Sequence, residues 1–292
     1  MGLGEALAIL SALAWSAGVI IYKRLGETLA PTRLNLMKNL LVLGLLLPTL
    51  AVMGTPPPQL SAAELAITLF SGLLGIAVAD SLYLTALNQL GAARMGILGN
   101  FYSPFVILLS FLLLGERLGP LQLVGFALVS SGVLVVGMPS VQEPAERRAQ
   151  RLGLLLGVSS IALMAVAIVL VKRILEAQPL IWMVALRLAG GIGGLLLLFA
   201  WRRESPLPAR AERAQIRWPI VLLGAFVGQY LSMVFWLGGY KYAPASVAAI
   251  LNETTSIFIV VLAALFLHEP LNRRKLLGVA LTLSGVACML LA

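Results

Sequence analysis

The sequence predicts an all-α polytopic membrane protein, and three observations support this fold class. Hydrophobic residues fill 60% of the 292 positions and charged residues only 11%, whereas soluble domains are about half apolar and about a quarter charged. The mean hydropathy is +0.98. Apolar runs of about 20 residues, the length that crosses a bilayer, recur along the whole chain. We therefore expect an integral membrane protein.

Charges, prolines and glycines divide the chain into ten apolar segments. The runs are continuous and leucine-rich, which favours transmembrane helices over the alternating strands of a barrel. The first run has no basic stretch before it and no clear small-residue cleavage site, so we expect it to be retained as a helix. The ten expected spans are residues 4–22, 34–53, 64–88, 95–114, 120–138, 152–171, 180–200, 218–240, 244–267 and 275–292.

The chain contains an internal repeat. The segment LLLGERLGPLQLVG at residues 112–125 returns as LFLHEPLNRRKLLG at residues 265–278. A shift of 153 residues aligns residues 80–138 with residues 233–291 without a gap. Leucines in apolar helices align by chance, so the matched polar residues and glycines carry the signal.

The matched residues extend the repeat over both halves of the chain. The shift of 153 residues pairs Glu116 with Glu269, and a second shift, of 149 residues, pairs Lys38 with Arg187. We therefore predict two repeats of five helices each. The predicted units are a first repeat at residues 1–139, a charged linker at 140–151 and a second repeat at 152–292.

Because five is an odd number, the two repeats are expected to lie inverted in the membrane. Inverted repeats allow one packing arrangement to occur in two mirrored states, open to either side. Glu116 and Glu269 then mark the same corner on opposite faces, and both are expected to have a structural role at hydrated helix ends. Glycines spaced by seven residues predict that the fifth and tenth helices pack closely, with each other or across a dimer. These are Gly125 with Gly132 and Gly278 with Gly285.

Two halves of five helices with these corner motifs resemble the EamA family of the drug/metabolite transporter superfamily. The motifs are GERL, LVG and SSG in the first half, and HEPL, LLG and LSG in the second, where His268 replaces the glycine before Glu269. The resemblance covers essentially the whole chain. It implies a secondary carrier, of which many export amino acids and other small metabolites. It also implies a central cavity lined chiefly by helices 1, 3, 4, 6, 8 and 9. We expect no cofactor or metal.

Four charged residues lie at least one helical turn away from the ends of the expected spans. A charge at the bilayer centre costs about 2.5–3.5 kcal/mol on insertion scales, so each needs a partner or a function. Lys38 is expected to pair with Asp80, and Arg187 with Glu253. Alternatively, Lys38 and Arg187 extend their long side chains to the interface. The short Glu253 side chain cannot do so near mid-membrane, which favours a functional role for it.

Polar and aromatic residues gather around these charges. The segment GNFYSP at residues 99–104 aligns with NETTSI at 252–257, so both halves place polar groups at corresponding depths. For any single side chain, hydrogen bonding between helices is the alternative explanation. The run GGIGG at 190–194 follows no strand and is expected to pack helices. The predicted substrate-binding residues are Glu253, Asp80, Arg187, Lys38, Trp15, Tyr83, Asn100, Tyr102, Ser103, Trp236, Tyr240, Asn252 and Thr254.

The same residues favour transport over other functions. The net charge of +9 comes from lysines and arginines in short loops, where lipid headgroups and insertion rules explain them, so nucleic-acid binding is not expected. One histidine and one cysteine are too few for a metal site built on these residues, and an enzyme is not expected. We expect a monomer or homodimer in a bacterial cytoplasmic (inner) membrane, with both termini outside.

The substrate class follows from the charges in the expected cavity. A site that contains both an arginine and acids suits a zwitterion, so the leading prediction is an exporter of amino acids or related zwitterions by alternating access. The alternative is a proton-coupled exporter of hydrophobic cations, in which Glu253 or Asp80 alternately holds a proton and the drug. The aromatic residues suit either substrate.

Overall fold

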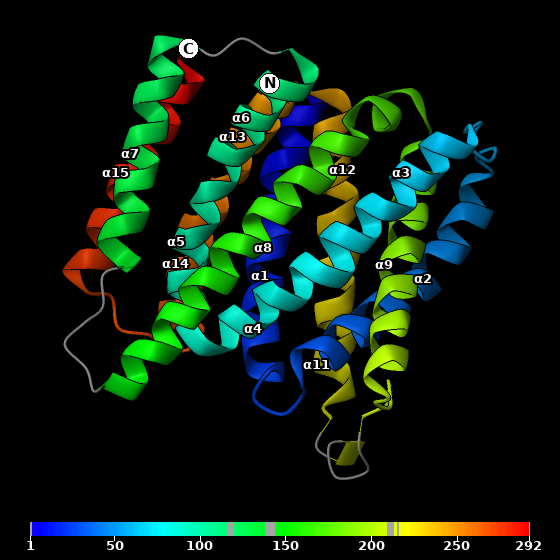
Figure 1. Ribbon diagram of the computed structural model, residues 1–292, viewed down its shortest axis with the longest axis horizontal. Coiled ribbons are helices and arrows are strands. Elements are labelled where there is room, and N and C mark those ends of the chain that lie inside the picture. The colour runs from blue at the N-terminus through cyan, green and yellow to red at the C-terminus, as the bar shows by residue number, and fades with distance from the viewer. Residues whose placement is uncertain (1, 116–118, 138–143, 209–212, 215, 292) are drawn as a thin grey trace.

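A computed structural model describes residues 2–115, 119–137, 144–208, 213–214 and 216–291. Within these ranges the secondary structure is helical and no strand occurs. Figure 1 shows long helices packed side by side in a bundle. Helices satisfy their own backbone hydrogen bonds, which is the requirement for an apolar chain in lipid. The predicted all-α class is confirmed.

The first half of the chain forms four helical rods and a fifth helix. Pro31 occupies the first turn of the second rod, where its missing N–H is not needed. Ser61 and Glu64 form a capping box at the start of the third. The elements are α1 (Leu3–Leu25), α2 (Pro31–Met53), α3 (Ala62–Gly72) with η1 (Leu73–Ala79) and α4 (Asp80–Leu90), α5 (Ala92–Leu98) with η2 (Gly99–Phe101) and α6 (Tyr102–Leu114), and α7 (Pro120–Gly137).

The second half follows the same order of elements. Its first helix begins at Pro144, inside the predicted linker 140–151, because the helix-forming run AERRAQR continues into the apolar span. The elements are α8 (Pro144–Ala177), α9 (Leu180–Arg202), α11 (Trp218–Leu223) with η3 (Gly224–Leu231) and α12 (Ser232–Tyr242), α13 (Ala245–Asn252) with α14 (Thr254–Phe266), and α15 (Arg273–Leu290).

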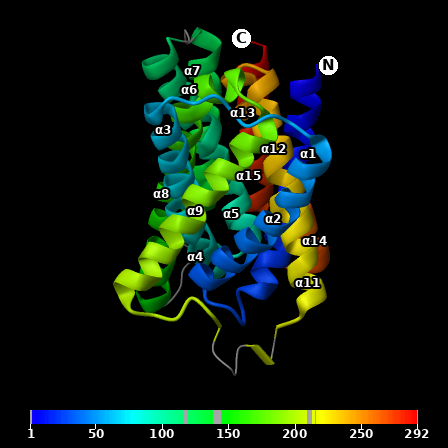
Figure 2. The same cartoon turned by 90° about the vertical axis from the view of Figure 1, so that its right-hand side faces the viewer.

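Eight helices in the described part of the chain are long and apolar enough to cross a membrane. The helices α7 and α15 are 18 residues each and lie where the fifth and tenth spans were expected. In Figures 1 and 2, α1 begins and α15 ends at the same end of the bundle, as an even number of crossings requires. A polytopic helical membrane protein is therefore supported, while ten spans in two inverted repeats stay a prediction.

Small residues allow the helices to cross closely. A Cβ added at Gly18 of α1 would collide with the Cα of Gly228 in η3, and one added at Gly190 of α9 would collide with the carbonyl of Leu69. The predicted packing role of GGIGG is confirmed. The predicted contact of the fifth helix with the tenth is also confirmed, since α7 packs along α15 with buried glycines on both helices. They are Gly125, Gly132, Gly278 and Gly285.

Hydrogen bonds from lysine and amide side chains to backbone carbonyls join two helices at one end of the bundle. Lys23, near the end of α1, donates to the carbonyl of Asn88 at 3.1 Å, and the Asn88 amide donates to the carbonyl of Gly26 at 3.1 Å. These contacts join the last turns of α1 and α4, at the lower end of the bundle in Figure 1. We call them the lower clasp.

A related set of contacts fastens the opposite end. Lys172 of α8, the 149-residue counterpart of Lys23, donates to the carbonyl of Ala243 at 3.3 Å. Lys241 of α12, the 153-residue counterpart of Asn88, donates to the carbonyl of Leu175 at 3.0 Å. These contacts, the upper clasp, join the last turns of α8 and α12 (Figure 1). Equivalent positions in the two halves thus make equivalent contacts at opposite ends.

Glu269 has the structural role predicted for it. Its carboxylate accepts the N–H of Ala92 at 2.7 Å and that of Ala93 at 3.2 Å, and Lys275 lies 3.3 Å from its second oxygen. The first N–H groups of a helix have no partner within it, and a carboxylate there also interacts favourably with the helix dipole. Glu269 therefore fixes α5 of the first half to the corner before α15. Its predicted counterpart Glu116 lies outside the described residues.

Candidate functional site

A central cavity of about 160 Å³ is lined by both halves of the chain. An engineered cavity of about 150 Å³ in another protein binds benzene, so this space can hold a small molecule. The lining comes from α1, the α3–α4 rod, the α5–α6 rod, α8, the α11–α12 rod and the α13–α14 rod, with one residue from α9. Apart from α9, these are the helices that the family resemblance implied.

The lining rods are interrupted beside the cavity at repeat-related positions. The π-helices η1 and η3 interrupt the third rod of each half, and they contribute Ile76 and Gln229 to the lining. The 3₁₀ turn η2 and the break between α13 and α14 interrupt the next rods, at Asn100 and at Glu253, its 153-residue counterpart. Irregular turns free backbone groups and are frequent at binding sites inside membrane proteins.

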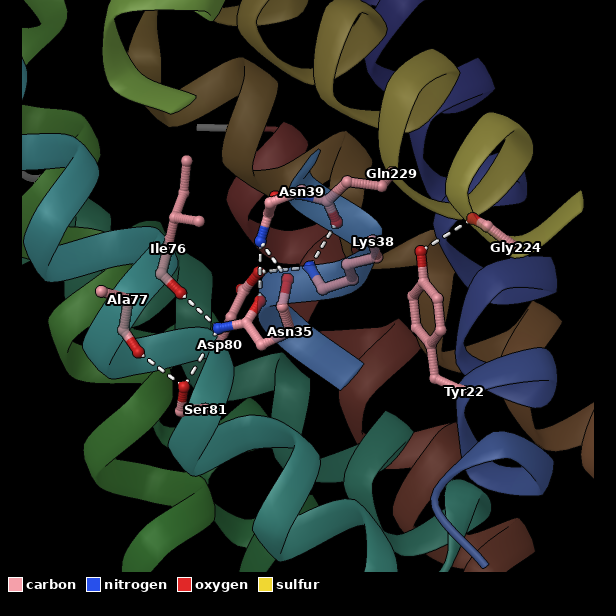
Figure 3. A network of polar contacts seen from close by, with 10 residues as sticks. All are labelled: Tyr22, Asn35, Lys38, Asn39, Ile76, Ala77, Asp80, Ser81, Gly224 and Gln229. Atoms are coloured by element: carbon pink, nitrogen blue, oxygen red, sulfur yellow. Dashed lines mark hydrogen bonds and ion pairs between the residues drawn. The ribbon is translucent and has the colours of Figure 1, made fainter. Parts of the chain in front are cut away.

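Buried side chains donate hydrogen bonds to backbone carbonyls of the two π-helices. Asn35 of α2 donates to the carbonyl of Ile76 in η1 at 2.7 Å, and Tyr22 of α1 donates to the carbonyl of Gly224 in η3 at 2.8 Å. Figure 3 shows both contacts around a polar network. They satisfy backbone groups that would be costly to leave unpaired in an apolar interior.

The predicted pair of Lys38 and Asp80 is confirmed. Lys38 Nζ lies 2.7 Å from Asp80 Oδ2 and donates to Gln229 Oε1, also at 2.7 Å. Asp80 and Gln229 line the cavity, whereas Lys38 does not. Figure 3 shows the three side chains together. Lys38 is 1% exposed and does not extend to the membrane surface. Each charge therefore offsets the other's desolvation.

The predicted pair of Arg187 with Glu253 is wrong. Arg187 of α9 donates to Ser71 Oγ and, at 3.2 Å, to the carbonyl of Ala167, and its guanidinium carbon lies 5.6 Å from the centre of the Trp236 ring. No acid of the described residues lies within ion-pair distance of Arg187. Its Nε atom has no hydrogen-bond partner among the described residues. The glycines of the α3–α9 crossing bring the two helices so close that the arginine reaches Ser71 and α8.

Glu253 finds a different partner at the end of a helix. Its Oε1 accepts the backbone N–H of Ser103 at 2.9 Å, in the first turn of α6. This hydrogen bond partly offsets the cost of burying the carboxylate, which is 3% exposed. No cation of the described residues pairs with it, and Glu253 lines the cavity. The cavity wall thus carries one cation and one anion that form no ion pair with another described residue.

Aromatic rings form two groups in the lining. Trp15 packs against Tyr83 with ring centres 5.5 Å apart on the side of the Lys38–Asp80 pair. Tyr102 packs against Trp236 at 6.3 Å on the side of Arg187. Aromatic faces attract cations and offer large apolar surfaces, so they can contact either the charged or the apolar part of a ligand.

The structure brings most of the predicted site residues to one cavity. Those that line it are Trp15, Asp80, Tyr83, Asn100, Tyr102, Arg187, Trp236, Asn252 and Glu253. Four others lie outside the lining. Lys38 holds Asp80, Ser103 holds Glu253, Tyr240 packs against Tyr102 and Trp236, and Thr254 donates to the carbonyl of Leu251.

The sequence reasoning missed the apolar and small residues of the lining. Three methionines from different helices face the cavity, and flexible methionines suit binding surfaces that adapt to a ligand. Ser11 also faces it, and its repeat pairing with Ser160 was a usable signal. The missed residues include Ser11, Met95, Met164, Ser232, Met233 and Ser256.

Comparison with known proteins identifies the family. The profile of the EamA-like transporter family matches residues 2–138 and again residues 151–291. The chain belongs to the EamA-like transporter family. The family predicted from the corner motifs is confirmed.

Relatives of this EamA-like transporter occur in Bacillus subtilis (strain 168). The chain is 27% identical to the uncharacterized transporter YvbV over 237 residues, 80% of this chain and 71% of that protein. It is 27% identical to the uncharacterized transporter YetK over 129 residues, 44% of this chain and 38% of that protein. A crystal structure with 17% identity matches with a TM-score of 0.73 over 99% of this chain and 96% of the other, which shows the shared fold.

Proposed function

We propose that this protein exports small zwitterionic metabolites, most simply neutral amino acids, by alternating access around the central cavity. The family establishes a membrane transporter. The observation that carries the proposal is that Arg187 and Glu253 line one cavity and that neither forms an ion pair with another residue of the described part of the chain. A zwitterion supplies both missing partners at once and leaves the net charge of the cavity unchanged.

Each end of the substrate has a distinct partner in this proposal. The substrate carboxylate binds Arg187, whose Nε has no partner among the described residues and whose planar group suits carboxylates. The substrate ammonium binds Glu253, which Ser103 holds in place. The aromatic rings and methionines contact the apolar side chain. A lipophilic cation would bind Glu253 but would meet the positive charge of Arg187 in the same cavity, which disfavours the multidrug alternative.

The clasps support a mechanism in which the two ends open in turn. Each clasp consists of a few hydrogen bonds from lysine or amide side chains to carbonyls at helix ends. Opening an end also separates buried apolar residues beside the clasp, such as Leu87 at the lower end and Leu175 at the upper end. A bound zwitterion neutralises the two wall charges and lowers the cost of enclosing them. Opening of the lower clasp with the upper one closed, and the reverse, then gives the two mirrored states.

The membrane and the direction of transport are part of the proposal. The resemblance to metabolite exporters favours export across a bacterial cytoplasmic membrane, without a catalytic step. The proposed pathway lies within one chain, in a monomer or in a homodimer.

The test is counterflow in liposomes that contain the purified protein. The panel comprises L-leucine as a zwitterion, L-lysine as a net cation, L-glutamate as a net anion and tetraphenylphosphonium as a lipophilic cation. We expect leucine to accumulate well above protein-free liposomes and above the other three compounds. Movement of tetraphenylphosphonium without leucine would favour the multidrug alternative, and movement of none of the compounds would contradict both.

A further inference from the structure

Three glycines line the central cavity, and two of them serve helix packing. A Cβ added at Gly96 of α5 would lie 2.8 Å from Ile259 Cγ2 in α14. A Cβ added at Gly75 of η1 would lie 3.1 Å from the Cβ of Ala167 in α8. A larger residue at either position would crowd a neighbouring helix, so these two glycines allow the helices to approach one another.

The third glycine of the lining, Gly99, has no packing role of this kind. Apart from its own turn of the chain, no described residue has an atom within 4 Å of a Cβ added at Gly99. Its backbone has φ −50° and ψ −29°, the right-handed helical conformation that residues with a side chain adopt readily. Glycine in a helical segment is less favourable than alanine. Neither packing nor backbone conformation therefore requires a glycine at this position.

The open space beside Gly99 belongs to the cavity. Met95 and Gly96 in the preceding turn line the cavity, and so does Asn100, the next residue. With 3.6 residues per turn, position 99 lies between positions 95 and 96 around the helix axis. A side chain at position 99 would therefore point into the cavity.

The surroundings of this space are apolar. Met95 and Ile259 lie on either side of the preceding turn, since Ile259 meets Gly96 there. A Cβ added at Gly157 of α8 would lie 3.1 Å from Met95 Sδ, and Ile161, one turn further along α8, also lines the cavity. The helix α5 contacts both α8 and α14 (Figure 1). These three helices thus surround the space beside Gly99 with side chains that suit an apolar group.

The apolar space lies close to the proposed site of the substrate ammonium. The N–H of Ser103, which holds Glu253 Oε1 at 2.9 Å, comes four residues after Gly99 on the same rod. At about 1.5 Å per residue, the two positions are about 6 Å apart along the helix axis. The ammonium and the side chain of an amino acid are attached to the same carbon. An amino acid bound at Glu253 can therefore place its side chain against position 99.

The two halves of the chain differ at this position of the repeat. The 153-residue counterpart of Gly99 is Asn252, which also lines the cavity and donates to the carbonyl of Ala248 at 2.8 Å. The second half thus presents an amide beside Glu253, where the first half presents a glycine beside Asn100. The cavity is therefore polar on one side and open and apolar on the other, as a substrate with one polar and one apolar part requires.

We propose that the space beside Gly99 binds the apolar side chain of the substrate, and that Gly99 determines the largest side chain that the transporter accepts. In a cavity of about 160 Å³, this narrows the substrate class to neutral amino acids with apolar side chains up to about the size of leucine. Gly99 is then a specificity-determining residue. The inference rests on the proposed transport function and adds to it the location and size of the side-chain site.

The first experiment compares a large and a small substrate in liposomes. The ratio of kcat/KM for leucine to that for alanine is measured for the parent protein, Gly99→Ala and Gly99→Val. We expect Gly99→Val to lower this ratio by about 10- to 200-fold, because its methyl groups occupy the side-chain site. Gly99→Ala should change the ratio in the same direction by less. The control Gly44→Val adds the same group at an exposed, open position of α2 and should keep the parental ratio.

The ratio distinguishes a size limit from a general effect on the protein. If a folded Gly99→Val variant loses leucine and alanine transport equally, position 99 acts through helix movement and the proposal is overturned. A parental ratio in both variants would overturn it as well. Gly99→Ala gives the answer should the valine variant fail to fold.

The second experiment places a chemical probe at position 99. Cys288 is the only cysteine of the sequence, so Gly99→Cys in a Cys288→Ser background carries a single thiol. We expect hydroxyethyl methanethiosulfonate to label this thiol, and leucine well above its KM for the variant to slow the labelling several-fold. The labelling rate of Gly44→Cys in the same background should not respond to leucine. A thiol at position 99 that is not labelled, or that transported leucine does not protect, would overturn the proposal.

The two experiments separate this inference from the proposed function. Leucine transport with an unchanged leucine-to-alanine ratio in the Gly99 variants would overturn the side-chain site and leave zwitterion transport intact. If the parent protein moves neither leucine nor alanine, the zwitterion proposal fails and the assignment of an amino-acid side chain fails with it. The labelling then still decides whether position 99 opens into the cavity.

Discussion

Replacement of Glu253 by glutamine is the most direct test of the proposed binding site. The amide keeps the shape of the side chain and an oxygen that can accept the N–H of Ser103, which lies 2.9 Å from Oε1. It removes the negative charge that faces the cavity. The contact of α14 with α6 should therefore survive, while the partner of the substrate ammonium is lost.

The magnitude follows from the kind of contact that disappears. A hydrogen bond to a charged group contributes about 1.5–3 kcal/mol. At about 1.4 kcal/mol for each factor of ten, Glu253→Gln should lower kcat/KM for leucine by about 10- to 150-fold. The thermal unfolding midpoint should change little, because a buried charge without a protein counter-ion is replaced by a neutral group of the same size.

The assay is initial-rate leucine transport in liposomes with equal amounts of folded protein. Glu204→Gln is the matched control, since it makes the same chemical change at an exposed position. The reasoning fails if Glu253→Gln transports leucine with the parental kcat/KM. Glu253 would then be a structural acid at the end of α6, and the ammonium would have to bind elsewhere.

Three further predictions concern packing and orientation. Gly18→Leu should destabilise the protein by about 1–3 kcal/mol, because its side chain would collide with η3 at Gly228. Gly44→Leu, at an open position, should leave the unfolding midpoint in detergent unchanged, and equal midpoints for both variants would contradict the close crossing. Glu269→Ala should cost about 1–3 kcal/mol by removing the acceptor for α5, and an unchanged midpoint would refute this role. A fluorescent reporter that matures only in the cytosol should stay dark at the C-terminus, and a bright signal would reverse the orientation.

Much of the cavity could be predicted from the sequence and its family resemblance. Polar residues at corresponding depths of the two halves identified Asn100 and Glu253, and both lie at breaks that face the cavity. The pairing of Lys38 with Asp80 followed from their depths and opposite charges. The methionines of the lining could not be identified from the sequence. In a chain that is 60% hydrophobic, the sequence around a methionine that faces the cavity does not differ from that around a methionine that faces lipid.

The sequence by itself determined that this chain is helical and built for a bilayer, because hydropathy and backbone hydrogen bonding act within each segment. Only the tertiary structure decided which charge meets which partner. Arg187 contacts Ser71 and the carbonyl of Ala167 rather than Glu253, because close glycine contacts fix the position of α9 against α3. Glu253 meets the first turn of α6, since the rotation and offset of neighbouring helices determine which buried groups come within hydrogen-bonding distance.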